Sequence, residues 1–200
     1  MSLSAFGLGA PERSYFWASW EGPGLEQMRL RLDATESVAH GLVMGVADGL
    51  PFRLHYKIKW GADWHTRKVV LELHTLQGVR ELSLKSDGRG HWRDEHGDPL
   101  PELDSCLDVD ISVTPFTNTL PVRRLDLEPG RSAELRVVYI AVPALTAKPA
   151  EQRYRCRERK SGRQLVTYEG LSTGFKADLE LDADGLVIDY PGIFRRLAPR

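Results

Sequence analysis

The chain lacks any long apolar run and any excess of charge of one sign. No run approaches the roughly 18 consecutive apolar residues of a membrane helix, so we expect no integral membrane segment. Its 27 Lys and Arg residues stand against 28 Asp and Glu residues, which gives a formal net charge of −1. Because phosphate binding requires a basic excess, we also expect no nucleic-acid partner.

Cysteine is scarce as well, with two residues in 200. Residues 1–16 carry no positively charged n-region and only a broken apolar run, which predicts no secretory signal and a cytoplasmic location. In that reducing compartment we expect Cys106 and Cys156 to be free thiols, with a disulfide between them as the alternative. We expect neither thiol to act as a nucleophile, because one neighbours aspartates and the other lies in an apolar setting.

The motifs of the common enzyme classes are absent. The sequence contains no GxSxG, Walker loop or CxxC. The six histidines offer neither HExxH nor a paired ligand spacing. The group of metal-type ligands at 91–98 has the composition of a solvated turn. We therefore predict no catalytic residue, no metal and no cofactor.

What the chain does have is an alternation of apolar and polar residues. Leu54, Tyr56, Ile58 and Trp60 alternate with charged residues, and the same period recurs at 28–32 and 175–181. Each of these runs predicts a half-buried strand. Further strands are predicted near 14–20, 36–46, 66–74, 79–85, 104–112, 132–142, 152–159, 163–168 and 186–190.

Turn chemistry separates these runs. Residues 86–88, 160–162 and 182–185 have the composition of hairpin turns. The segment 143–149 is interpreted as a connection, and 114–125 as a helical turn with Thr114 at its N-cap. No linker divides residues 1–200, so we predict one all-β domain. Its sheet should be mainly antiparallel and strongly curved or partly closed, an open barrel with a few short helical turns.

Residues 103–125 form the most informative stretch. Alternation places Asp108 and Asp110 on one face of a strand, about 6.6 Å apart, where like charges repel unless they are paired. An ion-pair network is favoured over catalysis, because two acids on one strand flank a sugar poorly. We expect the partner to be Arg67, Arg123 or Arg124.

The turn that follows gathers Thr114, Thr117, Asn118 and Thr119 around Phe116. We predict that Phe116 is buried and that the turn packs against the face that carries the aspartates. Asn118 is expected to bond protein backbone as scaffold. The alternative is that its amide faces a cavity of roughly 300 Å³ or more.

Tryptophans concentrate in the first half of the chain. Trp60 belongs to a clean alternating face and is predicted to fill the core. Trp20 and Trp64 lie beside glycine and charged residues and are better candidates for a surface or a pocket.

Three motifs carry a family resemblance: CLDVDISVTPFTNTLPVRRL at 106–125, WHTR at 64–67 and GLVIDYPGIFRR at 185–196. They resemble the bacterial family of putative glycolipid-binding proteins, formerly a domain of unknown function, over about residues 20–196. The resemblance implies a fold similar to the bacterial lipoprotein carriers, with a concave face able to hold an acyl chain. The positions it places near a ligand are Trp64, Arg67, Asp108, Asp110, Thr114, Phe116, Asn118, Arg123 and Arg124.

The resulting hypothesis is a non-catalytic protein, monomer or homodimer, that binds a glycolipid or another amphipathic small molecule in the concavity of a curved sheet. One alternative is an enzyme that acts on a sugar or lipid through Asp108 or Asp110. Another is a structural or protein-interaction domain with no small-molecule ligand. Lipid that co-purifies with the protein would favour the first hypothesis.

Overall fold

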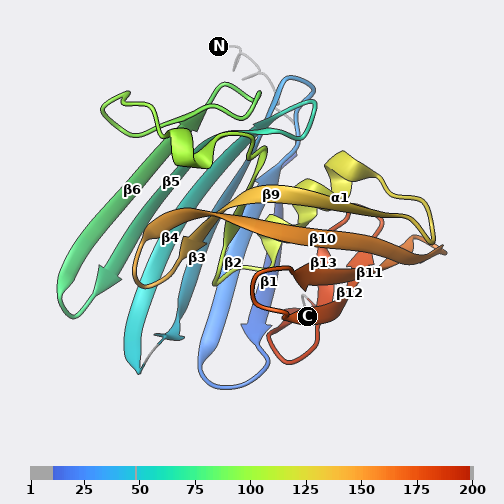
Figure 1. The fold of residues 1–200 in the computed structure, drawn as a ribbon. Coiled ribbons are helices and arrows are strands. Elements are labelled where there is room, and N and C mark those ends of the chain that lie inside the picture. Colours follow the sequence, from blue (N-terminus) through green and yellow to red (C-terminus); the bar gives the residue numbers. More distant parts are fainter. Residues whose placement is uncertain (1–10, 48, 199–200) are drawn as a thin grey trace, which may run out of the picture.

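A computed structural model of the protein describes residues 11–47 and 49–198. Within those residues the strands form one continuous sheet of 14, and every neighbouring pair is antiparallel except β8 with β9. The order across the sheet is β7-β6-β5-β4-β3-β2-β1-β14-β13-β12-β11-β10-β9-β8. The sheet is open, because the edge strands β7 and β8 do not pair with each other. The predicted all-β, mainly antiparallel, open architecture is confirmed (Figure 1).

The strands are β1 Arg13–Ser19, β2 Gly24–Arg31, β3 Glu36–Ala47, β4 Leu50–Gly61, β5 Thr66–Thr75, β6 Gly78–Ser86, β7 Trp92–Arg93, β8 Asp108–Ile111, β9 Ser132–Ala141, β10 Thr146–Lys160, β11 Arg163–Gly170, β12 Lys176–Asp182, β13 Val187–Tyr190 and β14 Phe194–Leu197. Two 3₁₀ turns, η1 Pro101–Leu103 and η2 Phe116–Asn118, and one helix, α1 Thr119–Leu125, complete the described chain. No helix among the described residues is long and apolar enough to cross a bilayer.

Period-two patterning builds the inner face of the sheet. Along β4, Leu54, Tyr56, Ile58 and Trp60 are buried while the intervening residues reach solvent. Trp60 is 1% exposed, so its predicted core position is confirmed, whereas Trp20 is 41% exposed. The β10–β11 hairpin turns through Ser161 and Gly162, both at positive φ, the backbone that a two-residue hairpin requires.

The sheet curls until the edge that carries β8 meets β5, the third strand from the opposite edge. The amide of Thr66, at the start of β5, donates to the carbonyl of Leu107, next to β8, at 3.0 Å. Strands β9 and β10 therefore cross over the face of β1–β6, and the two groups of strands form two facing layers (Figure 1). Strands β6 and β7 extend beyond this contact.

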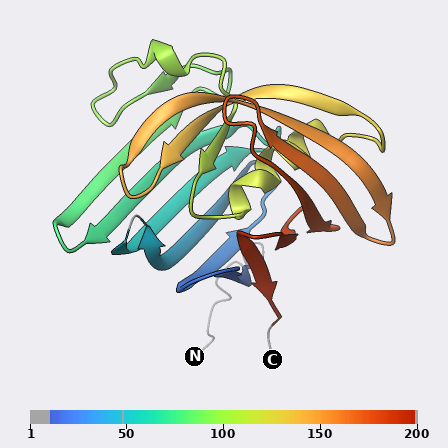
Figure 2. The same ribbon diagram turned by 60° about the horizontal axis from the view of Figure 1, so that its bottom comes forward.

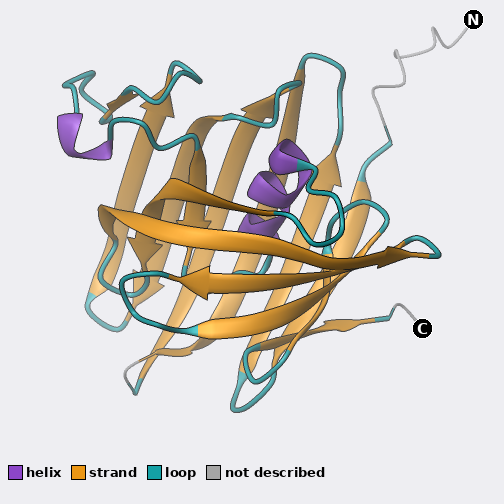
Figure 3. Ribbon diagram, turned by 45° about the vertical axis from the view of Figure 1, so that its right-hand side comes forward, coloured by secondary structure: helices purple, strands orange, loops and turns teal. Residues whose placement is uncertain are grey.

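The segment 114–125 lies inside the curl. Figure 3 shows η2 and α1 between the two layers of strands. Phe116 and Leu120 belong to the apolar cluster built mainly by β1–β6, whereas Val122 belongs to the cluster of β9–β13. The helical turn predicted there is present, but the N-cap predicted at Thr114 is wrong, because η2 begins after Pro115. The Thr114 hydroxyl still accepts the Phe116 amide at 3.1 Å. This segment joins the two halves of the core.

The first and last strands along the described chain, β1 and β14, are neighbours in the sheet. Phe16 in β1 is paired with Leu197 in β14, and Ser19 with Phe194 (Figure 2). This pairing is the seam that joins β2–β7 to β8–β13 within one sheet.

Some predicted boundaries are wrong. The segment 143–149, interpreted as a connection, contains the start of β10, which pairs with β9 from Thr146 onward. Pro149 fits there because β11 pairs only from Gln152, so the side on which proline lacks a donor is free. The strand predicted at 104–112 begins only at Asp108, because Ser105 has a φ of 71° and turns the chain. The short strands β7 and β14 were not predicted.

Candidate functional site

Asp108 is the more deeply buried of the two aspartates in β8. Its side chain is fully enclosed, and Arg124 of α1 binds it through Nε at 3.1 Å and Nη2 at 2.5 Å. Burial raises the pKa of Asp108, and the guanidinium of Arg124 acts in the opposite direction. The predicted pairing with one of three arginines is confirmed, and the partner is Arg124.

Asp110 has a different environment. One of its oxygens accepts the Gln152 amide at 2.6 Å, and the other accepts the Thr117 hydroxyl at 3.2 Å. Burial raises the pKa of this carboxyl, while the two hydrogen bonds lower it. No arginine binds it among the described residues, so each oxygen keeps a lone pair that a ligand hydroxyl could use.

Asp110 lines a cavity of about 420 Å³ whose wall comes from β8–β11, β13, β14 and the adjoining turns. Five aromatic residues contribute to its wall, and Tyr168, Phe175, Tyr190 and Phe194 form a chain of ring contacts with centroids 6.1 to 6.4 Å apart. The polar part of the wall includes Thr114, Asn118, Gln152 and Lys148. We call this space the aromatic cavity.

The turn at 114–118 forms part of the polar wall. Phe116 is fully buried, and the Thr117 hydroxyl reaches Asp110, so both predictions for this turn are confirmed. Asn118 donates to the Pro115 carbonyl at 3.2 Å and accepts the Tyr154 hydroxyl at 2.9 Å. It therefore bonds backbone as the scaffold prediction requires, and it also lines the aromatic cavity.

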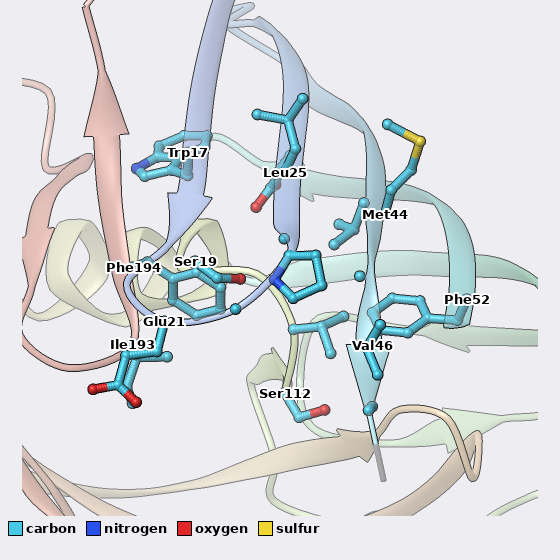
Figure 4. A pocket seen from close by; sticks show the side chains of 18 of the residues that line it. Trp17, Ser19, Glu21, Leu25, Met44, Val46, Phe52, Ser112, Ile193 and Phe194 are labelled. Atoms are coloured by element: carbon cyan, nitrogen blue, oxygen red, sulfur yellow. The ribbon is translucent and has the colours of Figure 1, made fainter. Parts of the chain in front are cut away.

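A second cavity, of about 280 Å³, adjoins the first and shares Ser112, Ile193 and Phe194 with it. Its wall combines the apolar side chains of Trp17, Leu25, Val43, Met44, Val46 and Phe52 from β1–β4 with polar groups that include Ser19, Glu21 and Ser112 (Figure 4). We call this space the apolar cavity. Ligand pockets commonly measure 300 to 1,000 Å³, so the two cavities together offer room for one amphipathic molecule.

Glu26 in β2 lines the apolar cavity and is hydrogen-bonded to Thr114, which lines the aromatic cavity. It is 2% exposed. One of its oxygens accepts the Tyr56 hydroxyl at 2.5 Å and the Thr114 hydroxyl at 2.7 Å. Its other oxygen is buried with no partner among the described residues. Burial raises the pKa of Glu26 to about 7, against the lowering effect of the two hydroxyls.

Glu26 is not among the site residues predicted from the sequence, although the alternation along β2 places it on the buried face. Met28 and Leu30 are inward residues of β2, and two residues further back the same face carries Glu26. Gly41 of β3 makes room for the cluster, because a Cβ there would lie 2.1 Å from two Tyr56 ring atoms.

Three other predicted site residues lie away from both cavities. Trp64, half-buried in the β4–β5 turn, stacks on Trp60 with ring centroids 5.7 Å apart. The guanidinium of Arg123 lies 5.0 Å from the Trp64 ring centre, and Arg67 binds Asp63 at 2.7 Å. Of the nine predicted positions, the structure brings Asp110, Thr114 and Asn118 together in the aromatic cavity.

The two cysteines are buried and unbridged. Burial raises the pKa of Cys106 to about 11, which disfavours its thiolate. Among the described residues, no group of three or more His, Cys, Asp or Glu side chains is arranged to hold a metal ion.

The open, curled sheet and its paired cavities define a class of small β-sheet proteins that enclose an amphipathic space. A family model described as "Putative glycolipid-binding" matches residues 14–196, and the chain belongs to this family. It is also similar to the crystal structure of a DUF1089 family protein from Pseudomonas aeruginosa, with 42% identity and a TM-score of 0.78. That match covers 98% of this chain and 99% of the other. No curated protein matches the chain.

Proposed function

We propose that the protein binds an amphipathic small molecule of the glycolipid type without chemically changing it. The observation that carries this proposal is the aromatic cavity, in which ring faces and a hydrogen-bonding group with free lone pairs meet in about 420 Å³. The apolar faces of sugars pack on aromatic rings, and their hydroxyls donate to carboxylates. The description of the family agrees with a ligand of this kind.

The ligand would lie across both cavities. The sugar or similar polar head occupies the aromatic cavity against Asp110, Gln152 and Tyr168. The acyl chain extends past Ser112 and Phe194, which line both spaces, into the apolar cavity. This placement sets the polar head against hydrogen-bonding side chains and the acyl chain against the apolar side chains of β1–β4.

The positions of the two β8 acids support a non-catalytic role. Asp108 is fully enclosed and Arg124 occupies its oxygens, so it has no access to a ligand. Asp110 lies in the cavity, but the other β8 acid cannot serve as its partner in a two-carboxylate mechanism. Binding is therefore the role that this arrangement supports.

The test is titration calorimetry with octyl β-D-glucoside below its micelle concentration. We expect saturable binding, and the Asp110→Asn variant should bind about tenfold more weakly because a charged hydrogen bond to a sugar hydroxyl is lost. The matched control is Asp178→Asn. Asp178 also accepts a threonine hydroxyl, that of Thr167 in β11, but it does not line the aromatic cavity.

A second variant tests the aromatic wall. Phe175 is 42% exposed, so Phe175→Ala should fold normally and still weaken octyl glucoside binding through lost ring contact. Equal affinities for all variants would contradict the proposed site. Release of nitrophenol from p-nitrophenyl β-D-glucoside that disappears in Asp110→Asn would contradict the non-catalytic role.

A further inference from the structure

Large apolar side chains are exposed at one end of the curled sheet. Strands β1–β6 form a meander, so the β1–β2, β3–β4 and β5–β6 hairpins all turn at the same end, the lower edge of Figure 1. Of the ten large hydrophobic residues that are exposed among the described ones, seven lie at these hairpins. We call them the hairpin rim: Trp20, Leu25, Met44, Val46, Leu50, Leu76 and Val79.

The register of the strands sets three rim residues in one row across the sheet, with Arg53 and His74 between Met44 and Val79. Leu25 is paired with Met44, Met44 with Arg53, and His74 with Val79, so these residues stand in one row across five strands. Leu76, at the tip of the β5–β6 hairpin, is 80% exposed. Exposed apolar residues gathered in this way mark an interaction surface, whereas scattered single residues do not.

The rim also borders one side of the apolar cavity. Leu25, Met44 and Val46 belong to the rim and at the same time line the apolar cavity. Gly22 and Pro23, in the β1–β2 turn, complete that side of the opening. Whatever covers the rim therefore meets the entrance through which an acyl chain would pass.

We propose that the hairpin rim inserts into the surface of a lipid bilayer and places the mouth of the apolar cavity against the lipid. The inference rests on the proposed function, because the cavity has a reason to open toward lipid only if its ligand is amphipathic. The ligand then moves between bilayer and cavity without crossing water.

The shape and chemistry of the rim favour a bilayer over a protein partner. Three separate hairpins with protruding tips do not offer the well-packed surface of about 800 Å² that a stable protein interface uses on each side. Trp20 is the kind of residue that settles at the boundary between lipid chains and water. Arg53 stands in the row behind the tips, with no salt bridge to any residue the structure describes, where its long side chain can reach lipid phosphates.

The experiment is sedimentation of the protein with phosphatidylcholine vesicles at low and high salt. We expect binding that persists at high salt, because inserted apolar side chains and not surface charges supply the attraction. Trp20 reports insertion directly, since vesicles should shift its fluorescence to shorter wavelength. The Trp20→Phe variant should lose this shift and still sediment with the vesicles.

Substitutions at the tips provide the specific test. Leu76→Asp and Val46→Asp change residues that are 80% and 48% exposed, so the fold should tolerate them. Each should lower vesicle partitioning about tenfold, since an apolar side chain no longer enters the lipid. The matched control is Leu197→Asp in β14, which is 39% exposed and lies outside the rim.

The outcomes separate this inference from the proposed function. Octyl glucoside binding without vesicle binding overturns the rim proposal and leaves the proposed function standing. Vesicle binding that is sensitive to Leu76→Asp, without octyl glucoside binding, supports the rim and contradicts the proposed function. Equal effects of Leu76→Asp and Leu197→Asp overturn the rim proposal, as does self-association of the protein that Leu76→Asp abolishes.

Discussion

At the scale of single residues, the pair Asp108–Arg124 dominates the energetics of the polar core. Asp108 is fully enclosed, and its Arg124 partner is about 15% exposed. In Arg124→Met the carboxyl of Asp108 stays buried without its cation, and unfolding should become easier by about 3–5 kcal/mol. Urea denaturation measures this change.

The neighbouring arginine provides the control. Arg123 is exposed and makes only a 3.4 Å hydrogen bond to the Ala183 carbonyl and a contact with the Trp64 ring. Arg123→Met should therefore cost less than about 1 kcal/mol. The double variant Asp108→Asn with Arg124→Met should recover part of the loss. Equal destabilisation by the two single arginine variants would disprove the special role of Arg124.

Glu26 makes the stability of the protein depend on pH near neutrality. Its pKa is raised from 4.5 to about 7 in the folded state. Between those pH values the folded protein holds a proton that the unfolded chain has released. The free energy of unfolding should therefore fall as pH rises from about 4.5 to about 7, by about 3 kcal/mol.

The variant Glu26→Gln cannot titrate and still accepts the Tyr56 and Thr114 hydroxyls through its amide oxygen. We expect the difference in unfolding free energy between wild type and Glu26→Gln to change by about 3 kcal/mol between pH 4.5 and about 7. Because Asp108 and Asp110 also have raised pKa values, the difference between the two proteins is the quantity to measure. Parallel pH profiles would show that Glu26 does not titrate there.

Residue-level predictions from the sequence succeeded where local pattern decides the outcome. The need of Asp108 for an arginine and the burial of Phe116 follow from charge repulsion and from the composition of the turn. The different neighbours of Asp108 and Asp110 could not be predicted. Gln152 lies in β10 and Arg124 lies in α1. Only the folding of the whole sheet brings both side chains to β8.

At the scale of elements, alternation and turn residues predicted most strands, because a half-buried strand and a tight hairpin each have a local signature. The exceptions have local physical causes. Pro149 looks like a strand breaker until its free side is known, and Ser105 adopts a positive φ that no composition rule assigns to serine. Strands as short as β7 and β14 contain too few residues for a period to show.

The elements also explain why the cavities escaped prediction. The aromatic cavity takes residues from β8–β11, β13, β14, η2 and the adjoining turns, which span positions 110 to 194 of the sequence. Alternation assigns each of these residues to a face of its own strand. It does not say which faces come together when the sheet bends.

At the scale of the whole molecule, the continuous sheet predicts that the chain unfolds as one unit. All five tryptophans lie between residues 17 and 92, so their fluorescence reports β1–β7 and the adjoining turns. Cys156 lies buried in β10 and reports the other half. In a Cys106→Ser background, the urea transitions seen by tryptophan fluorescence and by labelling of Cys156 should coincide. Separate midpoints would contradict the prediction of a single domain.

The seam between β1 and β14 has a consequence for folding during synthesis on the ribosome. The chain emerges from the ribosome in order, so β1 forms its hairpin with β2 long before β14 exists. During that interval β1 presents an unpaired edge, a template on which another nascent chain can add a strand. Arg13 at the start of β1 adds a charge that discourages such pairing. Pairing with β14 then covers this edge, so β1 stays open to pairing with other chains until β14 has been synthesised.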